Sequence, residues 1–115
     1  MEDRYLFKAK RIDNGEWVVG YIARYGHTGK EKYYIIPSYA SDLYAIEVDP
    51  PTICQCTGLK DKNGKLIWEN DIVKDEHGNL YKAFWQNNYY LKRMDAEVIG
   101  NIFDNPELLR KRGII

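Results

Sequence analysis

The chain has few of the features that mark membrane, secreted or disulfide-bonded proteins. Two cysteines in 115 residues are too few for a disulfide-stapled domain. No window approaches the roughly 18 consecutive apolar residues of a transmembrane helix. The N-terminal residues contain no apolar signal-peptide core. We therefore expect a single-domain-sized cytoplasmic protein with no membrane partner.

An excess of either charge is also missing. The 17 Lys and Arg residues are balanced by 17 Asp and Glu residues, which gives a formal net charge of zero. A nucleic-acid partner bound through its phosphates normally requires a basic surplus. The only basic run, Arg110-Lys-Arg112, lies near the C-terminus, and charged chain ends are usually solvated. The composition therefore disfavours a nucleic-acid partner without excluding one.

Motifs for catalysis are absent as well. The chain has no phosphate-binding glycine loop, no H-E-x-x-H and no G-x-S-x-G. His27 and His77 fall in predicted turns, with no nucleophile or orienting carboxylate forced into range. The glycine-containing loops after Asp61 and Asp75 lack the central Gly and closing Glu of a calcium loop. We therefore expect no enzyme activity, no catalytic residues and no cofactor.

The two cysteines, Cys54 and Cys56, are separated by one residue on a predicted strand. Structural zinc sites usually space paired cysteines by about two to four residues. An extended strand also holds alternate Cα atoms about 7 Å apart, which is too far for a disulfide. We therefore expect two small, buried hydrophobic side chains and no metal.

What the chain does contain favours β-structure. Aromatic residues make up 14% of the sequence, and Asn-, Asp- and Gly-rich turn signals recur at short intervals. In the first part, residues 5–10 and 17–24 alternate on either side of Asp13-Asn-Gly15, and a third strand, 33–36, stops at Pro37. Residues 37–42 resemble a loop. Pro50-Pro51 then predicts a boundary between an N-terminal antiparallel β unit, 1–50, and a C-terminal unit, 51–115.

The second unit shows about five short strands, which favours a small SH3-like barrel packed with the first unit. Asn63-Gly64 is typical of a type I′ hairpin turn, in which both residues have positive φ. Residues 80–85 and 89–94 are expected to form a second hairpin. One short C-terminal helix should begin at Asn105, with Pro106 in its first position.

Two blocks of this unit resemble the signature of the YopX-like proteins of bacteriophages and prophages. That pattern is VDPxTVGQxTGLKDKNGKxIYEGDIV followed by EVIGNIYENPELL, and its counterparts here are residues 47–74 and 97–109. The resemblance covers about the last two thirds of the chain. It implies the SH3-like barrel and a phage setting inside a bacterial host, but it carries no established activity. The family has glycine and an aromatic residue at the positions of Cys54 and Cys56, which argues against a shared metal site.

The aromatic-basic stretch 81–93 is the best candidate for a binding surface. Because side chains alternate along a strand, Leu80, Phe84 and Leu91 should face inward. The expected outward binding residues are then Lys82, Trp85, Tyr90 and Lys92. Such a face can stack bases or hold an extended peptide. The alternative is that these aromatic side chains pack on the N-terminal unit.

Two function classes follow. The first is a phage or prophage accessory protein that acts as a non-catalytic binding module for a host or phage protein. The second is a nucleic-acid-associated phage factor that uses the aromatic-basic hairpin. The neutral charge favours the first class. Because each β unit is small enough to have a marginal core, we also expect self-association, most simply as a homodimer.

Overall fold

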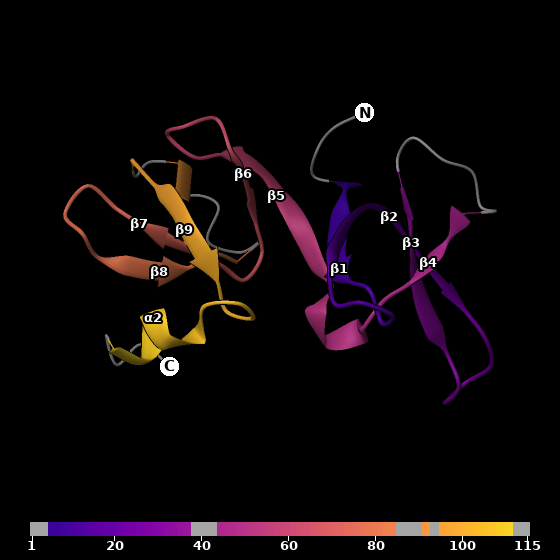
Figure 1. The fold of residues 1–115 in the computed structure, drawn as a ribbon. Coiled ribbons are helices and arrows are strands. Elements are labelled where there is room, and N and C mark those ends of the chain that lie inside the picture. The colour runs from indigo at the N-terminus through magenta and orange to yellow at the C-terminus, as the bar shows by residue number, and fades with distance from the viewer. Residues whose placement is uncertain (1–4, 38–43, 85–90, 93–94, 112–115) are drawn as a thin grey trace. The chain divides into compact units, whose positions relative to one another are not determined.

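The structure, a computed structural model, describes residues 5–37, 44–84, 91–92 and 95–111. The chain forms two compact units, Met1–Gln55 (unit 1) and Cys56–Ile115 (unit 2). Most of the described elements are antiparallel strands (Figure 1). The prediction of a mainly β protein is therefore confirmed. Within the described ranges, no helix has the length and apolar character needed to cross a membrane.

Unit 1 is built on an antiparallel sheet in the order β4-β3-β2-β1. Its strands are β1 (Phe7–Lys10), β2 (Trp17–Tyr25), β3 (Lys32–Pro37) and β4 (Ile46–Glu47). The predicted first hairpin is confirmed, with β1 and β2 paired from Phe7–Gly20 to Lys10–Trp17. The predicted third strand is also present and pairs with β2. Strand β5 (Cys54–Lys60) follows β1 in the sheet order and begins in unit 1.

The core of unit 1 lies on one face of this sheet. Ala9, Ile35 and Val48 are fully buried there, and partly buried neighbours such as Val18 and Ile22 pack against them. The chain after β4 returns to the end of β1, where Arg11 and Val48 form an antiparallel bridge. The diproline sequence forms a short 3₁₀ helix, η3 (Pro50–Thr52). The Thr52 hydroxyl accepts a hydrogen bond from the Lys10 backbone N–H at 2.9 Å, which ties η3 to β1.

Unit 2 contains β6 (Leu66–Trp68), β7 (Asp71–Lys74), β8 (Leu80–Lys82), β9 (Glu97–Asn101) and the helix α2 (Pro106–Lys111). Strand β6 pairs with β5, and the other three form a sheet in the order β8-β7-β9. The central strand β7 is buried on both faces: Ile72 packs in a cluster with Leu109 of α2, and Val73 packs in a second cluster with Ile67. The predicted short helix is confirmed, including its start at Pro106.

Two expectations for unit 2 are not met. The described strands do not close into a barrel, so the SH3-like barrel is not confirmed. The predicted hairpin of 80–85 with 89–94 is wrong, because β8 pairs with β7 and Leu91 and Lys92 are helical. Leu91 is nevertheless buried, in the cluster with Ile67 and Val73. A short apolar run can therefore fill a core from a helical turn as well as from a strand, and its sequence period does not separate the two.

Candidate functional site

The structure describes only half of the binding face predicted from the sequence. Lys82 is half-buried on β8, with its Nζ 4.6 Å from the centre of the Phe84 ring, and Lys92 is exposed. Trp85 and Tyr90 lie outside the described residues. Phe84, expected to point inward, is 41% exposed, because β8 ends before it. Lys82 lies on a strand, whereas Leu91 and Lys92 are helical. Lys82 and Lys92 therefore do not lie on one face of a β-hairpin.

The first block of the signature forms a turn organised by Asp61. The Oδ1 atom of Asp61 accepts hydrogen bonds from the backbone N–H groups of Asn63 and Lys65, both at 2.9 Å. The Gly64 N–H donates to the Asp61 carbonyl, and Gly64 alone of the pair has positive φ, at 83°. The predicted hairpin is therefore present but its type I′ turn is wrong. A three-residue loop closed by the aspartate replaces it, and only the αL position requires glycine.

The second oxygen of Asp61 connects this turn to a distant strand. Oδ2 accepts a hydrogen bond from the Val98 backbone N–H of β9 at 2.9 Å. The Lys62 N–H also donates to the Ala96 carbonyl at 2.8 Å, so the turn and the start of β9 are joined twice. Asp61 is only 7% exposed. With three backbone donors on its two oxygens, this carboxylate serves the fold of unit 2.

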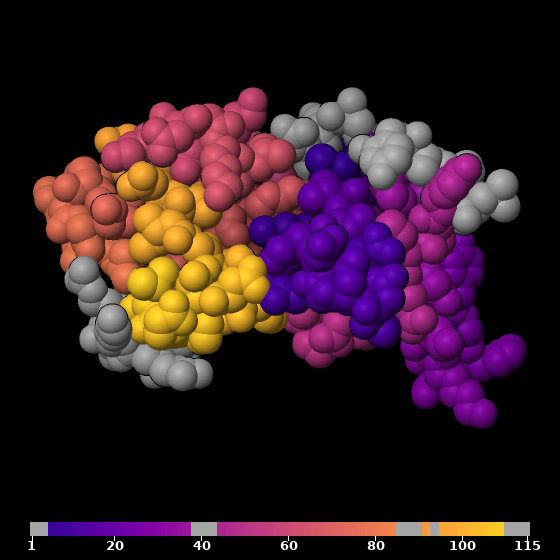
Figure 2. All heavy atoms as spheres, in the orientation of Figure 1, coloured from indigo at the N-terminus to yellow at the C-terminus, as the bar shows by residue number. Residues whose placement is uncertain are grey.

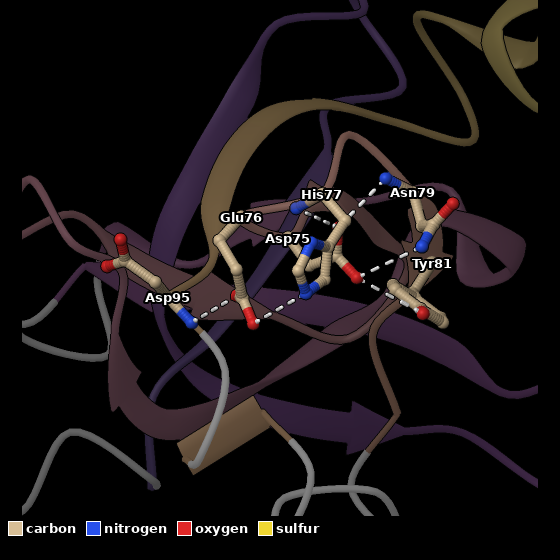
Figure 3. Close-up of polar contacts among 6 residues, drawn as sticks. All are labelled: Asp75, Glu76, His77, Asn79, Tyr81 and Asp95. Carbon is tan, nitrogen blue, oxygen red and sulfur yellow. Dashed lines mark hydrogen bonds and ion pairs between the residues drawn. The ribbon is translucent and has the colours of Figure 1, made fainter.

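A second turn, after Asp75, has the same backbone arrangement but a different surrounding (Figure 3). Its Oδ1 accepts hydrogen bonds from the N–H groups of His77 and Asn79, and the Gly78 N–H donates to the Asp75 carbonyl. The Oδ2 atom of Asp75 accepts a hydrogen bond at 3.3 Å from the hydroxyl of Tyr81, which lies on the adjoining strand β8. The carboxylate of Asp75 therefore stabilises its own loop and reaches no distant strand in the contacts described.

The pKa values of the two aspartates reflect these hydrogen bonds. Burial alone would raise the pKa of Asp61, but backbone N–H groups, with that of Val98 the strongest, hold the pKa below its ordinary value. The pKa of Asp75 is lowered in the same way, because hydrogen bonds led by the Asn79 N–H outweigh its desolvation. Desolvation and the nearby charge of Asp75 raise the pKa of Tyr81. Both carboxylates are thus held ionised, which suits accepting hydrogen bonds and not general-acid catalysis.

The acidic groups around the Asp75 turn do not assemble a metal site. Glu76 Oε2 accepts a hydrogen bond from the Asp95 backbone N–H at 3.2 Å, and Glu76 Oε1 lies 3.7 Å from His77 Nε2 (Figure 3). The hydrogen bond from Asp95 thus links Glu76 of the Asp75 turn to the residues just before β9. No group of three or more metal-ligating side chains occurs among the residues that the structure describes.

Other signature positions also have structural reasons. Asn70 has φ of 71° in the turn between β6 and β7, at the position where the YopX-like pattern has glycine. The next residue, Asp71, is buried, and its Oδ2 accepts a hydrogen bond from the Trp68 N–H at 2.8 Å. In the second block, a Cβ on Gly100 would lie 2.5 Å from Oδ1 of Asn105, the residue before α2. Asn70 and Asp71 therefore fix the turn between β6 and β7, and Gly100 allows Asn105 to pack closely against β9.

The two cysteines are buried on β5, as expected. Cys54 is 1% exposed, Cys56 is 0% exposed, and neither forms a disulfide bond. The Cys54 thiol lies 3.2 Å from the Thr52 carbonyl, and the Cys56 thiol lies 3.9 Å from the Ile67 carbonyl. Each therefore behaves as a small core residue with a weak polar contact.

Unit 1 also has an open hollow of about 260 Å³, lined by residues 11–13 and 45–47. This volume is slightly below the usual range of ligand pockets, which begins at about 300 Å³. The Arg11 guanidinium in its wall is already held by Asp13, with two hydrogen bonds of 2.9 and 2.8 Å. The hollow therefore offers no cation ready to hold a ligand.

The surface missed by the sequence-based search lies on unit 1, on the face of β1, β2 and β3 opposite the core. Strand pairing places Lys8 beside Val19, Lys10 beside Trp17, and Tyr21 beside Ile36. We call this the outer face, and its members are Lys8, Lys10, Trp17, Val19, Tyr21, Ala23, Tyr25, Tyr34 and Ile36. The alternation of Trp17, Val19 and Tyr21 was visible in the sequence. Both faces of β2 are apolar, however, so the pattern could not show which face is the core.

The outer face combines rigid aromatic groups with two cations. The Nζ atoms of Lys8 and Lys10 lie 4.6 and 5.5 Å from the centre of the Trp17 ring, which is within cation–π range. Farther along the hairpin, Tyr25 and Tyr34 make an edge-to-face contact at 5.5 Å. Val19 is 41% exposed and Tyr25 is 51% exposed. This face therefore presents apolar surface on a paired, well-defined backbone.

Comparison with known proteins identifies the family. No curated protein matches the chain. The family model described as YopX protein matches residues 5–94. This range runs from before β1 to beyond Leu91–Lys92 and includes all of the described part of unit 1. The family match therefore begins well before the two signature blocks, and it ends before the second one. Because it covers most of the 115 residues, the chain belongs to the YopX protein family.

Proposed function

We propose that this protein is a non-catalytic binding module, a phage or prophage accessory protein that contacts a host or phage protein in the bacterial cytoplasm. The observation that carries this proposal is the outer face of unit 1. Its half-exposed Trp17 and Tyr21 and its exposed Tyr25 are of the residue types enriched at protein interfaces. A paired sheet presents these side chains with little loss of conformational entropy on binding.

The hydrogen-bonded aspartates of unit 2 support a binding role over an enzymatic one. Asp61 and Asp71 accept hydrogen bonds from backbone N–H groups within unit 2, and Asp75 does so within its own loop. A catalytic carboxylate must instead reach substrate with a free oxygen. The proposal therefore assigns no catalytic residue and no cofactor to this chain.

The test is capture of partners by the tagged full chain from phage-infected host cells, with and without nuclease. Val19→Glu with Tyr25→Glu places two charges on the outer face. The matched variant, Tyr81→Glu with Phe84→Glu, places two charges on exposed aromatic positions of unit 2. We expect the outer-face variant alone to lose a nuclease-resistant protein partner. Loss in the unit 2 variant alone would move the binding surface to β8, and loss on nuclease treatment would favour the nucleic-acid class.

Self-association is the second part of the proposal. The exposed apolar side chains of the outer face can be covered by a second copy as well as by a different protein. Light scattering at tens of micromolar should then give about twice the chain mass of 13.5 kDa. The outer-face variant should return the mass to that of one chain. A wild-type protein of monomer mass would reject self-association.

A further inference from the structure

The end of the β2–β3 hairpin carries three cations that make no polar side-chain contact with the residues that the structure describes. We call residues 24–32 the arm. Residues 24–30 are all exposed, and the arm contains Arg24, Lys30 and Lys32 against one acid, Glu31. Among the described residues, no ion pair or other polar side-chain contact involves these three cations. The Glu31 carboxylate accepts a hydrogen bond from the Gly29 N–H at 3.0 Å, so the acid supports the turn.

The arm is a two-stranded ribbon that extends past its neighbours. Strand β1 pairs with β2 only over residues 17–20, and β4 pairs with β3 only at Tyr34 and Ile35. At the pair Arg24–Tyr33, the Val48 N–H after β4 still donates to the Tyr33 carbonyl at 2.9 Å. The last pair, Tyr25–Lys32, has no further strand beside it among the described residues. Figure 2 shows the purple tip of this hairpin standing clear of the rest of unit 1 at the lower right.

The tip is narrow and well defined. The Lys30 N–H donates to the His27 carbonyl at 2.8 Å, and Gly26 and Gly29 have φ of 118° and 82°. A Cβ on Gly26 would lie 2.6 Å from the Lys30 carbonyl oxygen. The backbone at Gly26 can therefore lie this close to the backbone at Lys30 only because residue 26 is a glycine. Such a tip is thin enough to enter a groove that admits a two-stranded ribbon.

The cations lie on both faces of this ribbon. Lys32 is paired with Tyr25 and shares its face, whereas Arg24 precedes Tyr25 and points to the opposite face. Lys30 is at the tip. A flat acidic protein surface would meet only one face of the ribbon. A groove with negative charge on both walls would meet both.

We propose that the arm binds duplex DNA, with the ribbon in the major groove and Arg24, Lys30 and Lys32 against phosphates of both strands. The major groove of B-DNA is about 12 Å wide and admits a two-stranded β-ribbon. The major groove of A-form RNA is too narrow for side chains to read. The site goes beyond the proposed protein-binding function. Tyr25 lies on both surfaces, but the arm variant leaves Val19 and Tyr25 unchanged and the outer-face variant leaves the three cations unchanged, so the two proposals are tested separately.

The neutral net charge does not oppose this inference, because the cations are local. They lie at positions 24, 30 and 32 of the sequence, where no run of basic residues is visible, and the hairpin brings them together. Three phosphate contacts give only modest, sequence-independent affinity, with a logarithmic salt slope of about −2.7. Raising the salt from about 50 to about 200 mM should therefore weaken binding roughly forty-fold.

The test uses the full chain and a fluorescent duplex of about 20 base pairs, with affinity measured by anisotropy at about 50 mM salt. The arm variant is Arg24→Gln, Lys30→Gln and Lys32→Gln. The matched variant, Lys60→Gln, Lys62→Gln and Lys65→Gln, removes the same charge from exposed positions of unit 2. Circular dichroism and a thermal melt establish that both variants are folded.

We expect the arm variant to bind at least tenfold more weakly than wild type and to lose most of its salt dependence. The matched variant should stay within about threefold of wild type, the change expected from net charge alone. No wild-type binding at low salt, or equal losses in the two variants, would overturn the proposal. Tighter binding to a single-stranded oligonucleotide or to duplex RNA than to duplex DNA would also overturn it, because neither offers the B-form major groove.

Discussion

The two units of this protein use their polar and aromatic residues in different ways. In unit 2, two aspartates of the signature accept hydrogen bonds from the protein's own backbone. Asp61 accepts one from the Val98 N–H of β9, and Asp71 accepts one from the Trp68 N–H. In unit 1, Val19 and Tyr25 of the outer face are exposed, and the three cations of the arm make no polar side-chain contact with the described part of the chain. The signature residues Asp61 and Asp71 therefore serve the fold of unit 2, and under our proposal it is unit 1, where the pattern is weaker, that presents the surface for binding.

The largest effect should come from breaking the Asp61 contacts. Asp61→Ala leaves three backbone N–H groups without their charged acceptor, and we expect the free energy of unfolding to fall by about 2–3 kcal/mol. Asp75→Ala is the matched control, because it removes the same turn contacts at a more exposed site, and its effect should be clearly smaller. Urea titration measures both variants. Equal losses would show that the link to β9 adds nothing to the turn.

The next largest loss of stability should come from substituting the turn glycines. The loss should be about equal in the two units. Gly64 in unit 2 and Gly15 in unit 1 have φ of 83° and 72°, and a Cβ at either position would meet nothing within 4 Å. Gly64→Val and Gly15→Val therefore differ from wild type mainly by backbone strain of about 1–3 kcal/mol. Thermal melts of the two variants test this. An unchanged melting temperature for Gly64→Val would contradict the left-handed backbone conformation that the structure gives residue 64.

The stability of wild type and that of Asp61→Asn, which has no carboxylate at this position, should depend differently on pH. Because the pKa of Asp61 is lowered in the folded protein, its contribution is fully present above the unfolded-state pKa of about 3.9 and is lost as pH falls through the lower folded value. The difference in unfolding free energy between wild type and Asp61→Asn should thus be constant near neutral pH and shrink below about pH 4. Urea titrations across this range measure it. A difference that grows with acid would contradict the sign.

The smallest effect on stability should come from the exposed positions of unit 1. Arg24, Lys30 and Lys32 make no described polar side-chain contact, so their replacement by Gln should change the unfolding free energy by no more than about 0.5 kcal/mol. Urea titration of the triple variant measures this change. A loss of more than about 1 kcal/mol would mean that the arm is part of the fold of unit 1.

Local patterns predicted much of the fold. The alternation around Asp13-Asn-Gly15 located the first hairpin, and Asn105-Pro106 located the start of α2. The turn type at Asn63-Gly64 was mispredicted because the Asp61 side chain, two residues earlier, supplies an acceptor that changes the loop. The hairpin of 80–85 with 89–94 was mispredicted because Leu91 fills the core beside Val73 from a helical segment, and a short apolar run fits a strand equally well.

The candidate site was harder to predict than the fold. The search from the sequence followed runs of aromatic and basic residues and selected Lys82, Trp85, Tyr90 and Lys92. The outer face and the arm are assembled from residues on separate strands, and only the pairing register brings Lys10 to Trp17 and Lys32 to Tyr25. Such surfaces become visible when strand order is known.

The measurement that tests the central difference between the units most directly is partner capture by Asp61→Asn, compared with Val19→Glu and Tyr25→Glu, at a temperature where all variants are folded. If signature residues serve the fold and unit 1 presents the binding surface, Asp61→Asn captures the partner as wild type does, although its unfolding free energy is lower. The outer-face variant then captures none. A folded Asp61→Asn protein that fails to capture the partner, beside an outer-face variant that still does, would contradict this account.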